Sequence, residues 1–131
     1  MERTNYSTGT PWEAAVGYSR AVRVGPFVYV SGTTASDEYG QVHGDNPYSQ
    51  AGYIFRKIER SLHEVGATMS DVVRVRMFVT DIALWQEVGR AHGEVFGAVR
   101  PVSTMVEISR LVDPKHLVEI EVDAVIAGVA Q

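Results

Sequence analysis

Acidic side chains alternate along the C-terminal part of the chain, and this pattern could carry chemistry. Glu119, Glu121 and Asp123 occupy every second position, so on a strand they share one face and repel one another unless cations or solvent intervene. Arg74 and Arg76 alternate in the same way. The pattern favours a ladder of ion pairs between two strands or between subunits. It also leaves open a second interpretation, in which Glu119 faces a cleft while the other two acids form the ladder.

Other reactive side chains lack the partners that catalysis or metal binding would require. The chain has no cysteine, which excludes disulfides, thiolate zinc sites and a cysteine nucleophile. His43, His63, His92 and His116 show no spacing typical of metal ligands. A serine such as Ser103 would need a base to act as a nucleophile, and no Gly-x-Ser-x-Gly motif is present. We therefore expect neither a metal site nor a serine nucleophile.

Length and charge limit the number of domains and the kinds of partner that we expect for this chain. The 131 residues suit one domain, 1–131, that buries roughly two-thirds of its unfolded surface. The net charge of −4 and the scattered arginines argue against nucleic acid as a partner, since phosphate binding needs a basic cluster.

There is no apolar run long enough to span a membrane, and the first ten residues are polar. We expect a cytoplasmic protein without a membrane partner.

The spacing of apolar residues, together with the residues that cap or end helices, predicts the elements that must position these side chains. We predict five strands, at 20–24, 27–31, 71–80, 102–108 and 117–126, with helices at 47–65 and 82–96. Asn46 is an expected N-cap, followed by Pro47 at the first helical position, and Gly66 is an expected stop. Asp81 is expected to cap the second helix.

The predicted order β-β-α-β-α-β-β implies an α+β fold with two helices on one face of a mixed sheet. Right-handed strand-helix-strand connections place both helices on the same side. Along the strand 71–80, alternation predicts that Val73, Val75 and Met77 face inward while Arg74 and Phe78 face outward. The outer face is too apolar to leave exposed to water, so we predict that a second copy of the chain covers it.

The segment 100–123 resembles the signature of the reactive-intermediate deaminase family, RidA, also called YjgF or endoribonuclease L-PSP. The matching residues are Pro101, Val106-Glu107, Arg110-Leu111 and Val118-Glu119-Ile120-Glu121. The resemblance covers about 18–126. It implies a chorismate-mutase-like α+β fold and a homotrimer, with a ligand cleft for a small molecule at each subunit boundary.

The resemblance also implies roles for individual residues. Glu119 would position a water molecule, Tyr18 would close over the ligand, and Ser31 with Gly32 would line the cleft. Ser103 and Thr104 could hydrogen-bond a neutral ligand. The implied reaction is hydrolytic deamination of an imine or enamine, which is electrophilic enough to need no cofactor.

Ser103 departs from the pattern of the family that the chain resembles. In its deaminating members, an arginine stands two residues after the proline and holds the substrate carboxylate, a task that suits the planar guanidinium fork. Charge-assisted hydrogen bonds contribute ~1.5–3 kcal/mol each, so losing two would weaken capture by a factor on the order of 10² to 10⁴. Arg100 and Arg110 are the nearby candidates to replace it. Strand parity, however, directs Arg100 away from the cleft, and Arg110 matches an arginine that the family already carries.

Three functions follow, in order of preference. The first is hydrolysis or deamination of a small reactive metabolite, of the imine or enamine type, that lacks the usual carboxylate. The second is a non-catalytic small-molecule-binding or regulatory trimer. The third is the endoribonuclease of the older family label, which the acidic balance makes least favoured.

Overall fold

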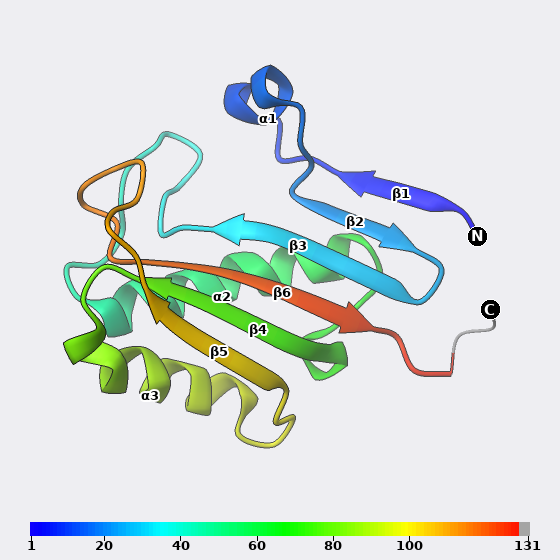
Figure 1. The fold of residues 1–131 in the computed structure, drawn as a ribbon. Helices are drawn as coiled ribbons and strands as arrows, with labels where there is room; N and C mark the ends of the chain where they lie inside the picture. The colour runs from blue at the N-terminus through cyan, green and yellow to red at the C-terminus, as the bar shows by residue number, and fades with distance from the viewer. Residues whose placement is uncertain (129–131) are drawn as a thin grey trace.

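The computed structural model describes residues 1–128 and consists of one sheet with two long helices against one face (Figure 1). The six strands lie in the order β1-β2-β3-β6-β4-β5. Their bounds are β1 Arg3–Tyr6, β2 Ala21–Val24, β3 Phe27–Thr33, β4 Val72–Val79, β5 Val102–Glu107 and β6 Val118–Val125. The helices are α1 Pro11–Val16, α2 Pro47–Glu64 and α3 Trp85–Phe96, with 3-10 turns η1 Met69–Asp71 and η2 Ile82–Leu84. Of the helices in residues 1–128, none combines the length and hydrophobicity needed to cross a membrane.

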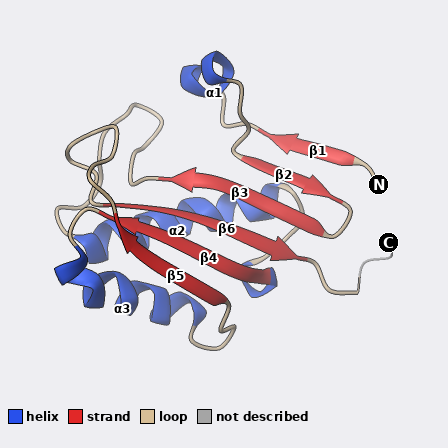
Figure 2. Cartoon of the chain, viewed as in Figure 1, coloured by secondary structure: helices blue, strands red, loops and turns tan. Residues whose placement is uncertain are grey.

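Local sequence signals place the two long helices. The Asn46 side chain accepts a hydrogen bond from the backbone N–H of Ser49 at 2.8 Å, as the predicted N-cap requires. The Asp81 side chain caps η2, and α3 follows immediately. Figure 2 shows α2 and α3 side by side beneath the sheet. The core lies between these helices and the inner sheet face, where the side chains of Ile54, Ile58, Val75, Val122 and Ile120 are fully buried.

Two helical crossover connections, through α2 and α3, link strands of the sheet. Strands β4 and β5 pair in parallel and are joined by α3, whereas β6 pairs antiparallel with both β3 and β4. The strand β6 therefore separates β3 from β4, which α2 connects. This arrangement confirms the predicted mixed sheet with both helices on one face.

A β-bulge interrupts β3 where it meets β6. Val30 pairs with Val122 and Thr33 pairs with Ile120, so three steps along β3 match two along β6. Both Val30 and Thr33 remain buried. The extra residue falls at Ser31 and Gly32, and the bulge therefore sets where these two residues point.

Two features of the fold differ from the sequence predictions. The N-terminal segment adds β1 beside β2 and the short helix α1, which the polar sequence did not indicate. The inward assignment of Val73 is wrong. A second bulge between Val72 and Arg74 makes Val72 the buried residue and leaves Val73 44% exposed.

The outer face of the sheet carries the predicted ion ladder. Arg76 Nη1 lies 3.5 Å from a carboxylate oxygen of both Glu121 and Asp123, and Arg74 Nε lies 3.7 Å from Asp123. These side chains are partly solvent-exposed, so each pair stabilises the chain only weakly. Val106, on the same face, is exposed in the isolated chain.

Candidate functional site

Five residues at one end of β2, β3 and β6 form a connected group, which we call the Glu119 cluster: Tyr18, Arg20, Ser31, Gly32 and Glu119. Arg20 precedes β2, Ser31 and Gly32 form the bulge of β3, and Glu119 lies on β6. The bulge brings Gly32 against Glu119 so closely that a Cβ atom on Gly32 would lie 2.5 Å from Glu119 Oε1. A residue with a side chain would therefore displace the carboxylate.

Arg20 connects the members of this cluster. Its guanidinium donates from Nε and Nη2 to Ser31 Oγ, and from Nη2 to the carbonyl oxygen of Gly32 at 2.9 Å. The Arg20 Cζ atom lies 5.7 Å from the centroid of the Tyr18 ring. Only 9% of Arg20 is exposed, so this buried cation holds the bulge and lies close to the acid.

Glu119 is a half-buried carboxyl with an altered acidity. Burial raises the pKa of Glu119, the positive charge of Arg20 opposes this rise, and the negative charge of Glu121 adds to it. A carboxyl with a raised pKa exchanges protons more readily near neutral pH than an exposed one. Glu119 therefore combines a half-buried position beside Arg20 with the raised pKa expected of a proton-transfer group.

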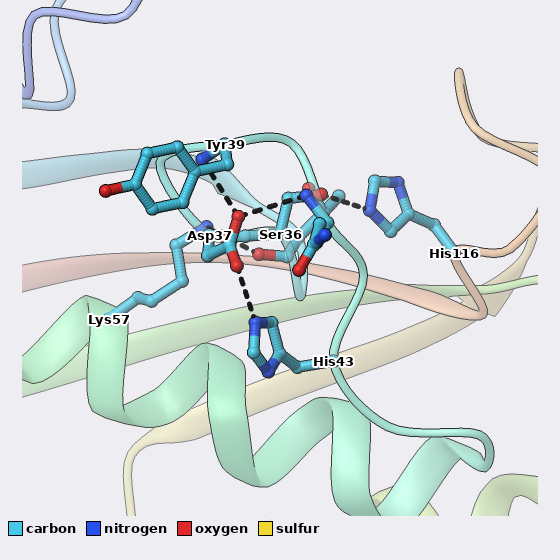
Figure 3. Close-up of polar contacts among 8 residues, drawn as sticks. Ser36, Asp37, Tyr39, His43, Lys57 and His116 are labelled. Atoms are coloured by element: carbon cyan, nitrogen blue, oxygen red, sulfur yellow. Dashed lines mark hydrogen bonds and ion pairs between the residues drawn. The ribbon is translucent and has the colours of Figure 1, made fainter.

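A loop next to the Glu119 cluster is fixed by polar contacts (Figure 3). Lys57 Nζ, from α2, donates to the carbonyl oxygens of Thr34 and Ser36 at 2.7 Å each. Ser36 Oγ lies 2.7 Å from Nε2 of His116, and a hydrogen bond of 2.8 Å joins Asp37 to His43. Burial, aided by the charge of Arg20, lowers the pKa of Lys57 to about 8. The segment that follows Gly32 is therefore held by Lys57 of α2 and by His116.

A second group, which we call the Ser103 hollow, lies between α3 and β5. It has a volume of about 390 Å³ and is lined by His92, Gly93, Phe96, Gly97, Arg100, Pro101 and Ser103. Ser103 Oγ lies 2.8 Å from Nε2 of His92. Ser103 pairs with the inward-facing Val75, and cross-strand partners share a sheet face. The Ser103 side chain therefore points toward α3.

Arg100 lies beside this hollow rather than away from it. The parity prediction assumed that residue 100 belongs to the strand, but β5 begins at Val102 and Arg100 has a left-handed φ of 58°. This conformation is uncommon for a residue with a side chain. Arg100 therefore borders the hollow that contains Ser103, and strand parity does not apply to it because it precedes β5.

The six predicted site residues fall into three places. Tyr18, Ser31, Gly32 and Glu119 lie in the Glu119 cluster. Ser103 lies on the helix-covered face of the sheet, whereas Thr104 pairs with Arg76 on the outer face. Within one chain, the structure does not bring Ser103 to Glu119, because Glu119 pairs with the outward Phe78.

Three further polar residues were not predicted for these places: Arg20, Lys57 and His92. Arg20 stood among scattered arginines, and only the bulge makes it a buried donor. The spacing of His92 indicated no metal site, and its contact with Ser103, eleven residues further along the chain, joins α3 to β5. Within residues 1–128, no group of three or more His, Asp or Glu side chains is arranged to hold a metal ion.

Comparisons with known proteins agree with this architecture. A family model described as Endoribonuclease L-PSP matches residues 8–126. An uncharacterized protein from Streptomyces coelicolor is 38% identical over 120 residues, which are 89% of this chain and 87% of that protein. A RutC family protein from Pyrococcus abyssi is 33% identical over 109 residues, 82% of this chain and 84% of that protein.

Solved structures share the same fold. A crystal structure of a member of the YjgF/YER057c/UK114 family from Mycobacterium tuberculosis has a TM-score of 0.88 and 50% identity, covering 95% of this chain and 100% of that one. The crystal structure of yeast Mmf1 has a TM-score of 0.84 and 26% identity, covering 95% and 99%. These likenesses confirm the α+β fold that the sequence predicted. The match of the family model over most of the chain shows that this protein belongs to the endoribonuclease L-PSP, or YjgF, family.

Proposed function

We propose that this protein hydrolyses a small imine or enamine to a carbonyl compound and ammonia or an amine, in the cytoplasm and without a cofactor. The observation that carries the proposal is Glu119, a half-buried carboxyl beside a buried guanidinium, packed against a residue without a side chain. A positioned carboxyl that exchanges protons is the main group that this reaction needs from a protein.

The reaction can be written with Glu119 as the proton carrier. The ionised carboxyl takes a proton from water as the water oxygen bonds to the C=N carbon, and returns this proton to the nitrogen to give a neutral carbinolamine. Glu119 then takes the proton of the new hydroxyl group and passes it to the nitrogen as the C–N bond breaks, so that the carbonyl compound and ammonia or the amine leave and Glu119 is ionised again. Ser31 and the backbone at Gly32 line the space beside Glu119, and Tyr18 lies over Arg20 at its edge.

The proposed site lies between subunits of a homotrimer. Ser103 and Glu119 lie on opposite sheet faces of one chain, so a ligand that touches both needs a second chain. Family resemblance implies such a cleft at each subunit boundary. In this assembly, the edge strand β5 of one subunit would lie near the Glu119 cluster of the next and bring the exposed Ser103 to it, whereas the Thr104 side chain points to the other sheet face.

We further propose that the preferred substrate lacks a carboxylate. The hydroxyl of Ser103 is neutral, and it is already hydrogen-bonded to His92. Arg100 precedes β5 and has a left-handed backbone, so it does not occupy the strand position from which the family's arginine would hold a carboxylate. A neutral imine is therefore expected to bind better than an amino-acid-derived one.

The test uses two imines generated in solution. An amino-acid oxidase produces 2-iminopropionate, an amine oxidase produces an uncharged alkyl imine, and release of the carbonyl product is followed with and without the protein. The protein should accelerate hydrolysis of the uncharged imine and have little effect on 2-iminopropionate. The Ser103→Arg variant should gain activity on 2-iminopropionate by a factor on the order of 10² or more.

Matched variants separate the parts of the proposal. Glu119→Gln should lower activity on the order of 10² to 10⁴-fold, whereas Glu64→Gln, at the exposed end of α2, should retain it. Strong wild-type activity on 2-iminopropionate that is lost in Arg100→Gln would assign the carboxylate contact to Arg100 and refute the proposed substrate range.

Two other outcomes would replace the hydrolase. Saturable ligand binding with no acceleration of any imine would indicate the binding or regulatory trimer. Digestion of RNA that disappears in Glu119→Ala would indicate the endoribonuclease.

A further inference from the structure

We infer that Ser103 and His92 form a nucleophile–base pair that accepts acyl groups from small neutral esters. This reaction differs from imine hydrolysis and uses the Ser103 hollow rather than the Glu119 cluster. Both partners belong to the same chain, so the pair exists without a second subunit.

The geometry of the pair is that of a hydroxyl next to its base. Ser103 Oγ lies 2.8 Å from His92 Nε2, within the range for an activated nucleophile. Two aromatic rings hold the imidazole: its centroid lies 6.2 Å from that of Phe55, at an interplanar angle of 74°, and 5.0 Å from that of Phe96. The imidazole is therefore oriented toward Ser103 before any substrate binds.

The surroundings of His92 favour its uncharged form, which can accept a proton. Burial lowers the pKa of His92, and no charged neighbour contributes to this change. The ring is therefore uncharged at neutral pH, and Nε2 can accept the hydroxyl proton of Ser103.

The Ser103 hollow has room and charge suited to a small ester. It is an open depression of about 390 Å³, so a small ester can reach the exposed Ser103 from solvent. Gly93 and Gly97 carry no side chain into this space, and Pro101 adds an apolar wall. Arg100 borders the hollow, where a cation can stabilise the negative charge that develops on an ester carbonyl oxygen.

The proposed reaction consumes only the ester and water. Ser103 Oγ bonds to the acyl carbon while its proton moves to His92 Nε2. The bond between the acyl carbon and the alcohol oxygen then breaks, and the alcohol leaves with that proton. Water hydrolyses the acyl-Ser103 intermediate in the same way, with His92 taking and returning the proton.

The pair lacks the third member of a catalytic triad. No acceptor within residues 1–128 forms a hydrogen bond with Nδ1 of His92, although such a group normally fixes the tautomer and speeds both steps. Turnover should therefore be slow, and with an activated ester, whose leaving group makes acylation faster than deacylation, the acyl-enzyme should accumulate.

The test uses p-nitrophenyl acetate and the full chain. Release of p-nitrophenol should show a burst that matches the concentration of the protein, and mass spectrometry should locate one acetyl group on Ser103. Ser103→Ala should abolish the burst, and His92→Gln should slow it by a factor on the order of 10². The matched variants Ser109→Ala and His63→Gln should leave the burst unchanged, and circular dichroism should show that all four variants are folded.

A thiol probe tests the pair independently of ester turnover. Because the chain has no cysteine, Ser103→Cys introduces a single thiol beside His92, and Ser109→Cys introduces one without this neighbour. The thiol at position 103 should react with iodoacetamide at least tenfold faster, and adding His92→Gln should remove this difference. Acetylation confined to lysines or the N-terminus, or equal thiol reactivity at the two positions, would overturn the inference.

Discussion

Arg20 is a buried cation whose bonds determine the position of a neighbouring acid. It donates to Ser31 and to the carbonyl oxygen of Gly32, and these contacts stabilise a bulge that places Gly32 against Glu119. Losing such a charged donor would leave two partly buried acceptors without this partner, at a cost of up to ~1–3 kcal/mol for each. Arg20 therefore acts as a positioning residue for Glu119.

Gly32 provides a direct test of how closely the acid must be placed. In the Gly32→Ala variant, the new Cβ would overlap Glu119 Oε1, and the flexible carboxylate would move because the backbone cannot. We expect imine hydrolysis to fall on the order of 10²-fold, as misplacement by about 1 Å can cause. The free energy of unfolding should change by less than ~1 kcal/mol, since the overlap is with a side-chain end.

The control for this variant is Gly52→Ala on α2, where an added Cβ meets only Arg56 Nη1 at 3.8 Å. It should retain full activity. Urea unfolding and the imine assay on both variants provide the measurements. Undiminished activity in Gly32→Ala would show that the contact with Glu119 has no role in the reaction.

Local signals were sufficient to predict the elements that carry the site. The Asn46 cap and the apolar spacing of α2 predicted this helix, and alternation predicted β4 and β6. The predicted hairpin between β2 and β3 also forms, with Gly25 in its turn at a φ of 59°. Each of these signals depends on neighbours within a few residues.

Features that depend on distant neighbours could not be predicted from these signals. The bulges at Val73 and at Ser31–Gly32 arise from pairing with β6, far along the chain. The contact between His92 and Ser103 requires the packing of α3 against β5. The same holds for Arg20, because its sequence context does not distinguish it from an exposed arginine, whereas in the structure it is buried against the bulge of β3.

Lys57 connects α2 to the loop after β3, and its altered acidity makes this connection testable. The pKa of Lys57 is about 8 in the folded chain, against an ordinary value of 10.5, so between these values the unfolded chain binds more protons. The free energy of unfolding should therefore rise with pH across this window. In Lys57→Met this contribution should be absent, and the amides near Thr34 and Ser36 should exchange faster.

Urea unfolding of both proteins, measured across the window from about 8 to 10.5, gives the comparison. Lys115→Met is a matched control, because this lysine lies on an exposed loop. A pH dependence that is identical in the parent and in Lys57→Met would contradict the role assigned to Lys57.

At the scale of the whole molecule, the outer sheet face remains to be covered. Tyr29, Val102 and Val106 are 50%, 59% and 42% exposed in the single chain, and they lie on the face opposite the helices. Exposed apolar side chains on one sheet face are typical of surfaces that pack against another chain. This face also carries Glu119.

We expect the protein to sediment as a trimer and Val106→Asp to sediment as a monomer. A buried, unpaired carboxylate in the interface would cost more than the lost apolar contact. The control is Val112→Asp, because Val112 is fully exposed in the loop after β5 and its change should leave the trimer intact. Sedimentation velocity measures all three proteins, and a parent that sediments as a monomer would refute the assembly.

The bulge in β3 also limits how the chain tolerates insertions and deletions. Because Val30 and Thr33 both face the core although they are three positions apart, the strand changes its inside–outside phase between them. Removing one residue there would restore regular alternation with both side chains still in the core, so the hairpin would keep its facing and lose the bulge. A gap opened at this point in a comparison of relatives therefore represents a strand without the bulge that brings Gly32 against Glu119.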